Sequence, residues 1–138
     1  MAKIAHISDT HIRNLRYHKE YREVFSTLFV KLKEEKVDYI ISPEFVKLCS
    51  EFLIGLSEVA PTYIILGNHD GNLKNSSRED AISPIVEALN LPNLFLLKHS
   101  GETELDQEFT INVLSVFDRS NWISPSNPNR INVALYHG

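Results

Sequence analysis

Apolar residues follow two different patterns along this chain, and each pattern predicts one kind of secondary structure. Apolar residues spaced three or four apart are typical of helices with one buried face, and this spacing from Tyr21 to Leu32 predicts a first helix. Alternating Phe109, Ile111 and Val113 predict a strand with one exposed face. Together with short apolar runs elsewhere, this pattern predicts strands at residues 3–7, 37–41, 63–66, 94–97, 109–113 and 131–136.

Serine followed by proline marks two further helix starts. Ser83-Pro84 predicts a short helix through Leu89, and Ser42-Pro43-Glu44 predicts a longer one, with Ser42 as N-cap and Pro43 as the first helical residue. Strands that alternate with helices in a chain of 138 residues, 43% of them hydrophobic, predict a single α/β domain over residues 1–138. The longer helix would present to the core the side chains of Phe45, Leu48, Cys49, Phe52 and Leu56.

Charge and cysteine content narrow the class of protein. Eighteen acidic against fourteen basic residues give a net charge of −4, which argues against a purely electrostatic nucleic-acid binder. The same charge is compatible with an enzyme that holds phosphates through metal ions. The one cysteine, Cys49, has no partner for an internal disulfide, and no leader peptide or membrane-length apolar run is present. We therefore expect a cytoplasmic protein.

Polar side chains of metal-ligand type follow three of the predicted strands. Asp9 and His11 follow the first strand, Asn68 follows the strand at residues 63–66, and His137 follows the last. Open α/β sheets bind ligands beyond the carboxyl ends of their strands, so these residues predict a metal site at one edge. A hydrogen-bonded turn is the alternative for each motif taken alone. Their joint placement favours the metal site.

These motifs resemble those of the calcineurin-like metallophosphoesterases. The resemblance rests on Asp9-x-His11, on Gly67-Asn68-His69-Asp70 and on a strand that ends in His137-Gly138. Within the superfamily, Ile7-Ser8-Asp9-Thr10-His11 near the first residue, followed by a long helix, is most similar to SbcD-type DNA repair nucleases, including phage versions. The resemblance implies a metallophosphoesterase-like β-sandwich flanked by helices.

The resemblance also implies a role for each motif residue. Asp9 and His11 would bind a first divalent metal ion and Asn68 and His137 a second, with Mn²⁺ as the expected metal in a two-metal hydrolysis. The motif residue that follows Asn68, His69, would be the general acid or would stabilise the transition state. The residue after it, Asp70, would orient the imidazole rather than bind metal.

The implied function is hydrolysis of phosphodiester bonds in DNA, as an exonuclease or endonuclease in repair or recombination. By the same resemblance the partners are DNA and an SMC-like ATPase of the SbcC type, with a possible homodimer and no membrane. Trp122 is a candidate for stacking on bases. Basic side chains that follow the two metal motifs would contact the DNA backbone, unless they are simply solvated charges: Arg13, Arg16, Lys74 and Arg78.

The chain departs from the family pattern in two places. A Gly-Asp motif, whose aspartate bridges the two metals, should follow the strand at residues 37–41, but that strand runs directly into Ser42-Pro43-Glu44. Strand-to-helix connections commonly contain about two to six residues, so we expect that a loop is missing here. The family's Gly-His-x-His motif is also absent after His137. We therefore predict an incomplete nuclease domain with impaired activity, because water would fill much of each metal shell.

Two other functions stay open on the sequence alone. One alternative is a phosphodiesterase for small molecules or a protein phosphatase, which use the same metal chemistry. The other is a non-catalytic remnant that keeps the fold as a binding module, which an intact Gly-Asp loop and a downstream Gly-His-x-His motif would reject.

Overall fold

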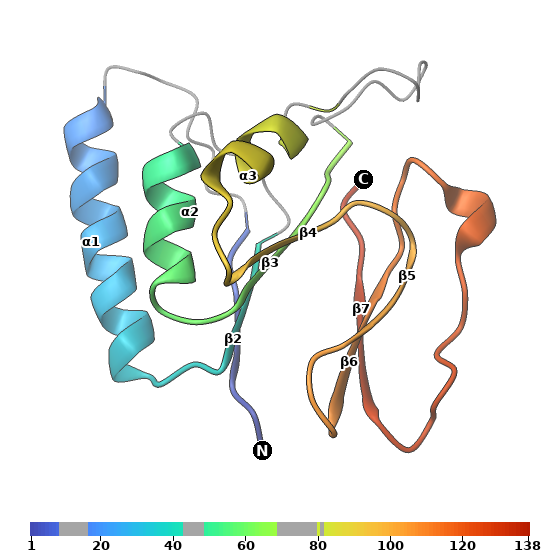
Figure 1. The fold of residues 1–138 in the computed structure, drawn as a ribbon. Coiled ribbons are helices and arrows are strands. Elements are labelled where there is room, and N and C mark those ends of the chain that lie inside the picture. The colour runs from blue at the N-terminus through green and yellow to red at the C-terminus, as the bar shows by residue number, and fades with distance from the viewer. Residues whose placement is uncertain (9–16, 43–48, 69–79, 81) are drawn as a thin grey trace.

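Four short strands form a parallel sheet at the centre of the molecule (Figure 1). The computed structural model describes residues 1–8, 17–42, 49–68, 80 and 82–138. Within these, the parallel sheet has the order β1-β2-β3-β4. Its strands are β1 (Ile4–His6), β2 (Tyr39–Ser42), β3 (Thr62–Ile65) and β4 (Leu94–Leu97).

Three helices cover one face of the parallel sheet: α1 (His18–Glu34), α2 (Cys49–Ser57) and α3 (Ser83–Leu89). Successive side chains of a strand point to opposite faces, so alternate strand residues such as Ile40 and Ile64 reach the helices. There they share a buried cluster with Phe25, Phe52 and Leu56. This cluster is the larger of the two hydrophobic cores.

Helices α1 and α2 approach each other closely at Gly55. A Cβ atom at this position would lie 2.3 Å from the ring of Phe29, so only glycine fits without displacing that ring. Arg22 and Glu51 join the same two helices at the surface, with Nε and Oε2 2.9 Å apart. Both side chains of this pair are exposed, and the packing at Gly55 rather than the ion pair holds the helices together.

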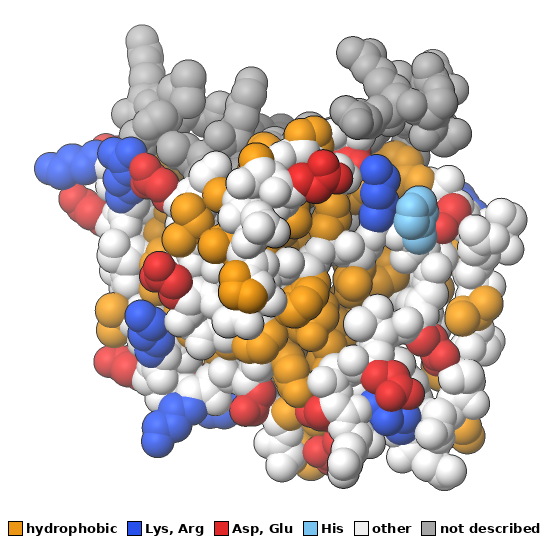
Figure 2. Space-filling model, in the orientation of Figure 1, with side chains coloured by type: hydrophobic (Ala, Val, Ile, Leu, Met, Phe, Trp, Pro, Cys, Tyr) orange, Lys and Arg blue, Asp and Glu red, His pale blue; other side chains and the backbone are white. Residues whose placement is uncertain are grey.

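A second, three-stranded sheet packs on the other face of the parallel sheet. Its strands are β5 (Gly101–Glu104), β6 (Phe109–Val113) and β7 (Ile131–Leu135). β5 and β6 form an antiparallel pair, and β7 adds parallel to β6. A second core lies between the sheets and contains Ile41, Tyr63, Ile65, Ile111, Val113 and Leu135. The layers are therefore helices, parallel sheet and mixed sheet, which confirms the predicted α/β sandwich. Figure 2 shows hydrophobic side chains in the middle of one face of these layers and charged ones around its margin.

The segment that connects β6 to β7 covers the outer face of the mixed sheet. It includes one short 3-10 helix, Arg119–Asn121. The Asn112 side chain donates to the carbonyl of Ile123 at 2.8 Å, and the Ser126 amide donates to the Glu102 carboxylate at 2.7 Å. All five residues of β6 are buried as a result. The prediction that this strand has an exposed face is therefore wrong.

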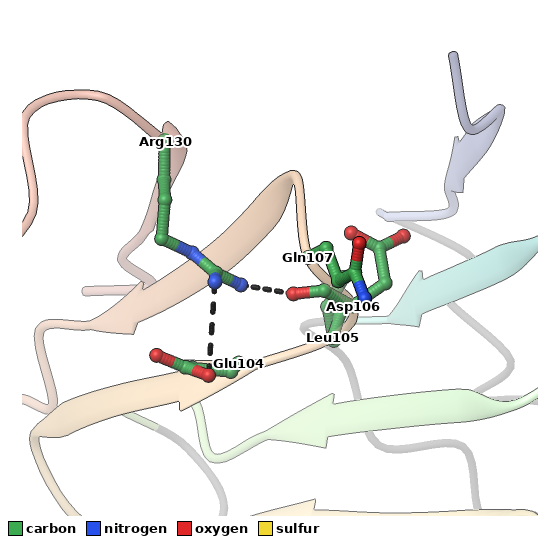
Figure 3. Close-up of a pocket in the computed structure, with 5 residues that line it drawn as sticks. All are labelled: Glu104, Leu105, Asp106, Gln107 and Arg130. Carbon is green, nitrogen blue, oxygen red and sulfur yellow. Dashed lines mark hydrogen bonds and ion pairs between the residues drawn. The ribbon is translucent and has the colours of Figure 1, made fainter.

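A polar clamp joins the two sheets at the amino ends of β2 and β7. The Tyr39 hydroxyl donates to Asp106 at 2.8 Å, and this bond, with burial, raises the pKa of Tyr39 to about 12. Arg130 donates to the Thr110 hydroxyl at 2.7 Å. It also donates to the carbonyl of Asp106 (Figure 3). Arg130 also lines an open pocket of about 410 Å³ with Glu104, Leu105 and Gln107. Because the guanidinium is already bonded to the chain, we assign this pocket a structural role.

Most predicted elements are present, with small shifts of their ends. The helix Ser83–Leu89 and the strand Leu94–Leu97 have the predicted bounds. Ser42 is the last residue of β2 and pairs with Ile64, so the strand extends one residue further than predicted, and the helix start predicted after Ser42 lies outside the described residues. Helix α2 is described from Cys49 onwards, so the junction between this strand and its helix also lies outside the described residues. Pro43, Glu44, Phe45 and Leu48 lie outside the described residues.

Candidate functional site

The carboxyl ends of β1, β2, β3 and β7 point to the same end of the molecule (Figure 1). The carboxyl-terminal parts of three of these strands pack together, because Ile41, Ile65 and Leu135 belong to the same buried cluster. The polar residues that follow these strands therefore emerge at a common edge, which we call the carboxyl edge. Ligands of α/β sheets bind at such an edge.

Two of the predicted metal ligands lie at this edge. Asn68 follows β3 after the buried Leu66 and Gly67, and His137 follows β7 after Tyr136. Both Asn68 and His137 are partly buried. Both side chains are therefore held at the mouth of the sandwich by strands that end in its core.

The other residues named for the site lie outside the described part of the chain. They are the predicted ligands of the first metal, the predicted acid with its orienting carboxylate, and the basic side chains: Asp9, His11, His69, Asp70, Arg13, Arg16, Lys74 and Arg78. Within the described ranges, no group of three or more His, Cys, Asp or Glu side chains is arranged to hold a metal ion.

The described donors fit a divalent cation by their chemistry. Asn68 offers an amide oxygen and His137 an imidazole nitrogen, and oxygen with nitrogen ligands suits manganese and zinc. The Ser42 hydroxyl lies at the end of β2, is buried, and has no hydrogen-bond partner among the described residues. An unpaired buried hydroxyl costs about 1–3 kcal/mol. This unmet polar atom stands at the strand after which the family pattern places its bridging aspartate.

An ion pair at the carboxyl end of β4 was not predicted from the sequence. The carboxylate of Asp80, whose side chain is 4% exposed, lies 2.7 Å from the Lys98 ammonium. It also accepts hydrogen bonds from the Ile82 amide at 2.9 Å and from the Ser83 amide at 2.6 Å, so it caps α3. The available signal was an aspartate shortly before a Ser-Pro helix start. The pair fastens α3 to the end of β4.

We expect this ion pair to make stability depend on pH in the acid range. Burial favours the neutral form of Asp80, but the bonds from Lys98, Ser83 and Ile82 outweigh it and lower the pKa to about 2. A lowered pKa stabilises the fold above the ordinary value of 3.8, and this contribution is lost as the pH falls towards 2. We expect it to be about 1–2 kcal/mol, because solvent screens the half-exposed Lys98.

Urea unfolding of the wild-type protein and of Asp80→Asn at several pH values checks this expectation. The stability difference between the two proteins should be largest near neutral pH and should shrink below about pH 4. A difference that stays constant from neutral pH to about pH 2 would show that the charge on Asp80 does not stabilise the fold.

A second carboxylate, Asp118, ties the turn after β4 to the segment after β6. It accepts hydrogen bonds from the Ser100 amide at 3.0 Å and from the Ser100 hydroxyl at 2.5 Å, and His99 Nδ1 lies 3.8 Å away. Burial raises the pKa of Asp118, but the hydrogen bonds from Ser100 lower it by more than burial raises it. The net pKa is below the ordinary value, so the carboxyl is charged. The Ser100 hydroxyl donates to the carboxylate rather than to the imidazole. The trio therefore lacks the serine-to-histidine hydrogen bond of a nucleophilic triad.

Comparison with known proteins gives a family and one relative. The family described as calcineurin-like phosphoesterase matches residues 2–138. The uncharacterized protein R555 of Acanthamoeba polyphaga mimivirus is 39% identical over 161 residues, an alignment that covers 98% of this chain and 12% of the relative. The chain thus spans about one eighth of the length of that relative. None of the described helices is long and apolar enough to cross a membrane.

The alignment with the mimivirus protein is longer than this chain, which is relevant to the missing Gly-Asp motif. The alignment spans 161 residues and this chain has 138, so the relative carries at least 23 residues (161 − 138) with no counterpart here. A difference of this size is large enough to hold a loop with a metal ligand.

Proposed function

The chain belongs to the calcineurin-like phosphoesterase family, and we propose that it forms the catalytic domain of an SbcD-type nuclease that cleaves DNA in repair or recombination. The family supports metal-dependent hydrolysis of phosphoesters. The observation that carries the proposal is the carboxyl edge, where Asn68 and His137 emerge from strands that share one core. The similarity of Ile7-Ser8-Asp9-Thr10-His11, followed by a long helix, to SbcD-type nucleases supports DNA as substrate.

The residues of this chain would divide the work between binding and proton transfer. Asp9 and His11 would hold one divalent ion, and Asn68 and His137 another. A bound pair of Mn²⁺ ions supplies positive charge opposite the phosphate and lowers the pKa of the attacking water.

Proton transfer would fall to the residues that follow Asn68. His69, when protonated, would donate to the leaving oxygen, so that the departing strand leaves as an alcohol. Asp70 would accept a hydrogen bond from the same imidazole and hold it in the orientation needed. Arg13, Arg16, Lys74 and Arg78 would contact the phosphate backbone on either side.

We propose that this chain binds metal ions weakly, because the expected bridging aspartate is absent after β2. Ser42-Pro43-Glu44 contains no Gly-Asp pair, and the relative carries additional residues. Without a bridging aspartate, water would occupy positions that a carboxylate normally fills. Calorimetric titration with manganese should therefore show weak binding, and two tight sites would contradict this expectation.

The resemblance also supports partners for the nuclease. An SMC-like ATPase of the SbcC type would present DNA to the carboxyl edge, and two copies of the nuclease would act together. Co-purification of the full-length protein with such an ATPase tests this part of the proposal.

The central experiment compares substrates. Full-length protein is incubated with labelled linear DNA, with cyclic nucleotides and with a phosphoprotein, in manganese or in a chelator. We expect manganese-dependent cleavage of DNA and none in the chelator. Hydrolysis of only the cyclic nucleotides or the phosphoprotein would replace the proposal with a small-molecule phosphodiesterase or a protein phosphatase. DNA binding without hydrolysis of any substrate would leave a binding module.

A further inference from the structure

Three exposed side chains form a cluster that includes the residue directly after β7, and we call them the aromatic ledge: Arg119, Trp122 and Tyr136. The rings of Trp122 and Tyr136 meet edge to face, with centroids 5.7 Å apart and planes at 82°. The Arg119 guanidinium lies over the Trp122 ring, 5.8 Å from its centroid. Trp122 is 39% exposed and Tyr136 is 48% exposed, so both rings offer surface to a ligand.

The two rings of the ledge are held in place by the chain. The Trp122 indole N–H donates to the carbonyl of Ser115 at 2.7 Å, which fixes one edge of the ring. The Tyr136 ring lies against Gly138, where an added Cβ would come within 2.6 Å of the Tyr136 hydroxyl. The same Cβ would lie 2.6 Å from Val116. The rings are therefore preorganised, and a ligand that stacks on them would not need to order them first.

The charge of the ledge suits a phosphate. In the described part of the chain Arg119 is in none of the ion pairs, whereas the adjacent Asp118 accepts two hydrogen bonds from Ser100. The guanidinium is thus available to an anion, while the carboxylate of the preceding residue is occupied. Aromatic rings beside an unpaired cation are the features with which proteins bind single-stranded nucleic acids, because bases stack and phosphates pair with the cation.

We propose that the aromatic ledge binds an unpaired nucleotide of the substrate, with its base on Trp122 or Tyr136 and its phosphate on Arg119. Tyr136 directly precedes His137, so the bound nucleotide would lie beside the carboxyl edge. The inference rests on the proposed nuclease function and specifies its substrate further, as nucleic acid with a single-stranded or frayed segment. An apolar protein surface is the competing occupant, and it makes no use of Arg119.

The chain allows a direct test, because Trp122 is its single tryptophan. The protein is titrated with a thymidine oligonucleotide of about 15 residues in the presence of a chelator. The control is an abasic oligomer with the same number of phosphates. We expect the thymidine oligomer to quench the fluorescence of Trp122 and the abasic oligomer to leave it unchanged. No quenching, or equal quenching by both oligomers, would overturn the proposal.

Variants extend the test to the other two residues of the ledge. Tyr136→Ala and Trp122→Ala should each weaken binding of a labelled oligonucleotide, measured by anisotropy, by about 10-fold. Arg119→Gln should weaken binding and reduce its dependence on salt. Phe95→Ala is the matched control, because Phe95 is also 39% exposed but lies on β4, and its affinity should equal that of the wild type. Circular dichroism shows whether each variant folds. If Trp122→Ala does not fold, Tyr136→Ala still tests the proposal.

The outcomes separate this inference from the proposed function. Hydrolysis of DNA without quenching of Trp122 would reject the ledge and keep the nuclease. Base-dependent quenching without hydrolysis of DNA would keep the ledge and reject the nuclease. Equal affinity of Phe95→Ala and Tyr136→Ala would show that the ledge does not contribute to binding.

Discussion

Replacing Phe52 with alanine should lower the free energy of unfolding by about 3–5 kcal/mol. Phe52 is 1% exposed and its ring centroid lies 4.5 Å from that of Phe25 and 6.1 Å from that of Phe29. The alanine variant loses the burial of the ring and leaves a cavity among these aromatic side chains. The tight contact between Gly55 and Phe29 limits how far α2 can move to fill the cavity.

Urea unfolding followed by circular dichroism measures this loss. Val24→Ala is the control, because Val24 lies on α1 but is 60% exposed, and its substitution should change stability by no more than about 0.5 kcal/mol. A loss below about 1 kcal/mol in Phe52→Ala would show that the core between helices and parallel sheet can close around the missing ring. Domains of this kind are stable by about 5–15 kcal/mol, so the expected loss threatens the folded state itself.

Strands buried on both faces were predicted from sequence because burial leaves a continuous apolar run. Tyr63-Ile-Ile shows this run, and all four residues of β3 are buried. Leu94-Phe-Leu-Leu shows the same run and forms β4, but Phe95 in this strand is exposed. The helix that starts at Ser83 was predicted because its serine and proline act locally. The predicted helix start at Ser42 is not tested in the same way: pairing with Ile64 extends β2 through the serine, and the residues that would form the first turn of the helix lie outside the described part of the chain.

Elements that depend on distant contacts were not predictable. β5 consists of Gly101-Glu-Thr-Glu104, which has no apolar pattern, and it is a strand because it pairs with β6. Thr110 and Asn112 suggest an exposed face of β6, but the connection to β7 buries both of them. The spacing of apolar residues along β6 does not reveal that the segment between β6 and β7 covers this face.

The candidate site divides in the same way. The edge was predictable, because polar residues that follow apolar strands emerge at strand ends, and Asn68 and His137 lie there. The ion pair of Asp80 with Lys98 was not predictable, since it joins residues on either side of α3. The aromatic ledge was only half visible: Trp122 was a candidate for stacking, but its contacts with Arg119 and Tyr136 exist only in the fold.

Substitution of His137 with alanine should lower metal-dependent phosphodiester hydrolysis by about 100-fold or more, and it should also weaken manganese binding. His137 emerges from β7 at the carboxyl edge, where it would be a ligand of one metal ion. His69→Ala should reduce hydrolysis by a similar factor, about 10²–10⁴, but for the different reason that a proton donor is lost. Manganese affinity should therefore fall in His137→Ala and stay close to the wild-type value in His69→Ala.

Two measurements on the full-length protein separate these roles, and a third variant controls for position. Steady-state hydrolysis of bis(p-nitrophenyl) phosphate reports activity on a substrate without bases, and calorimetric titration with manganese reports binding. His99→Ala is the control, because His99 follows β4 at the same edge but is exposed and bonded to no predicted ligand among the described residues. Equal manganese affinity in His137→Ala and the wild type would remove His137 from the metal site. Reduced affinity in His69→Ala would instead make His69 a ligand, because an acid that touches only the leaving oxygen contributes nothing to a metal bound without substrate.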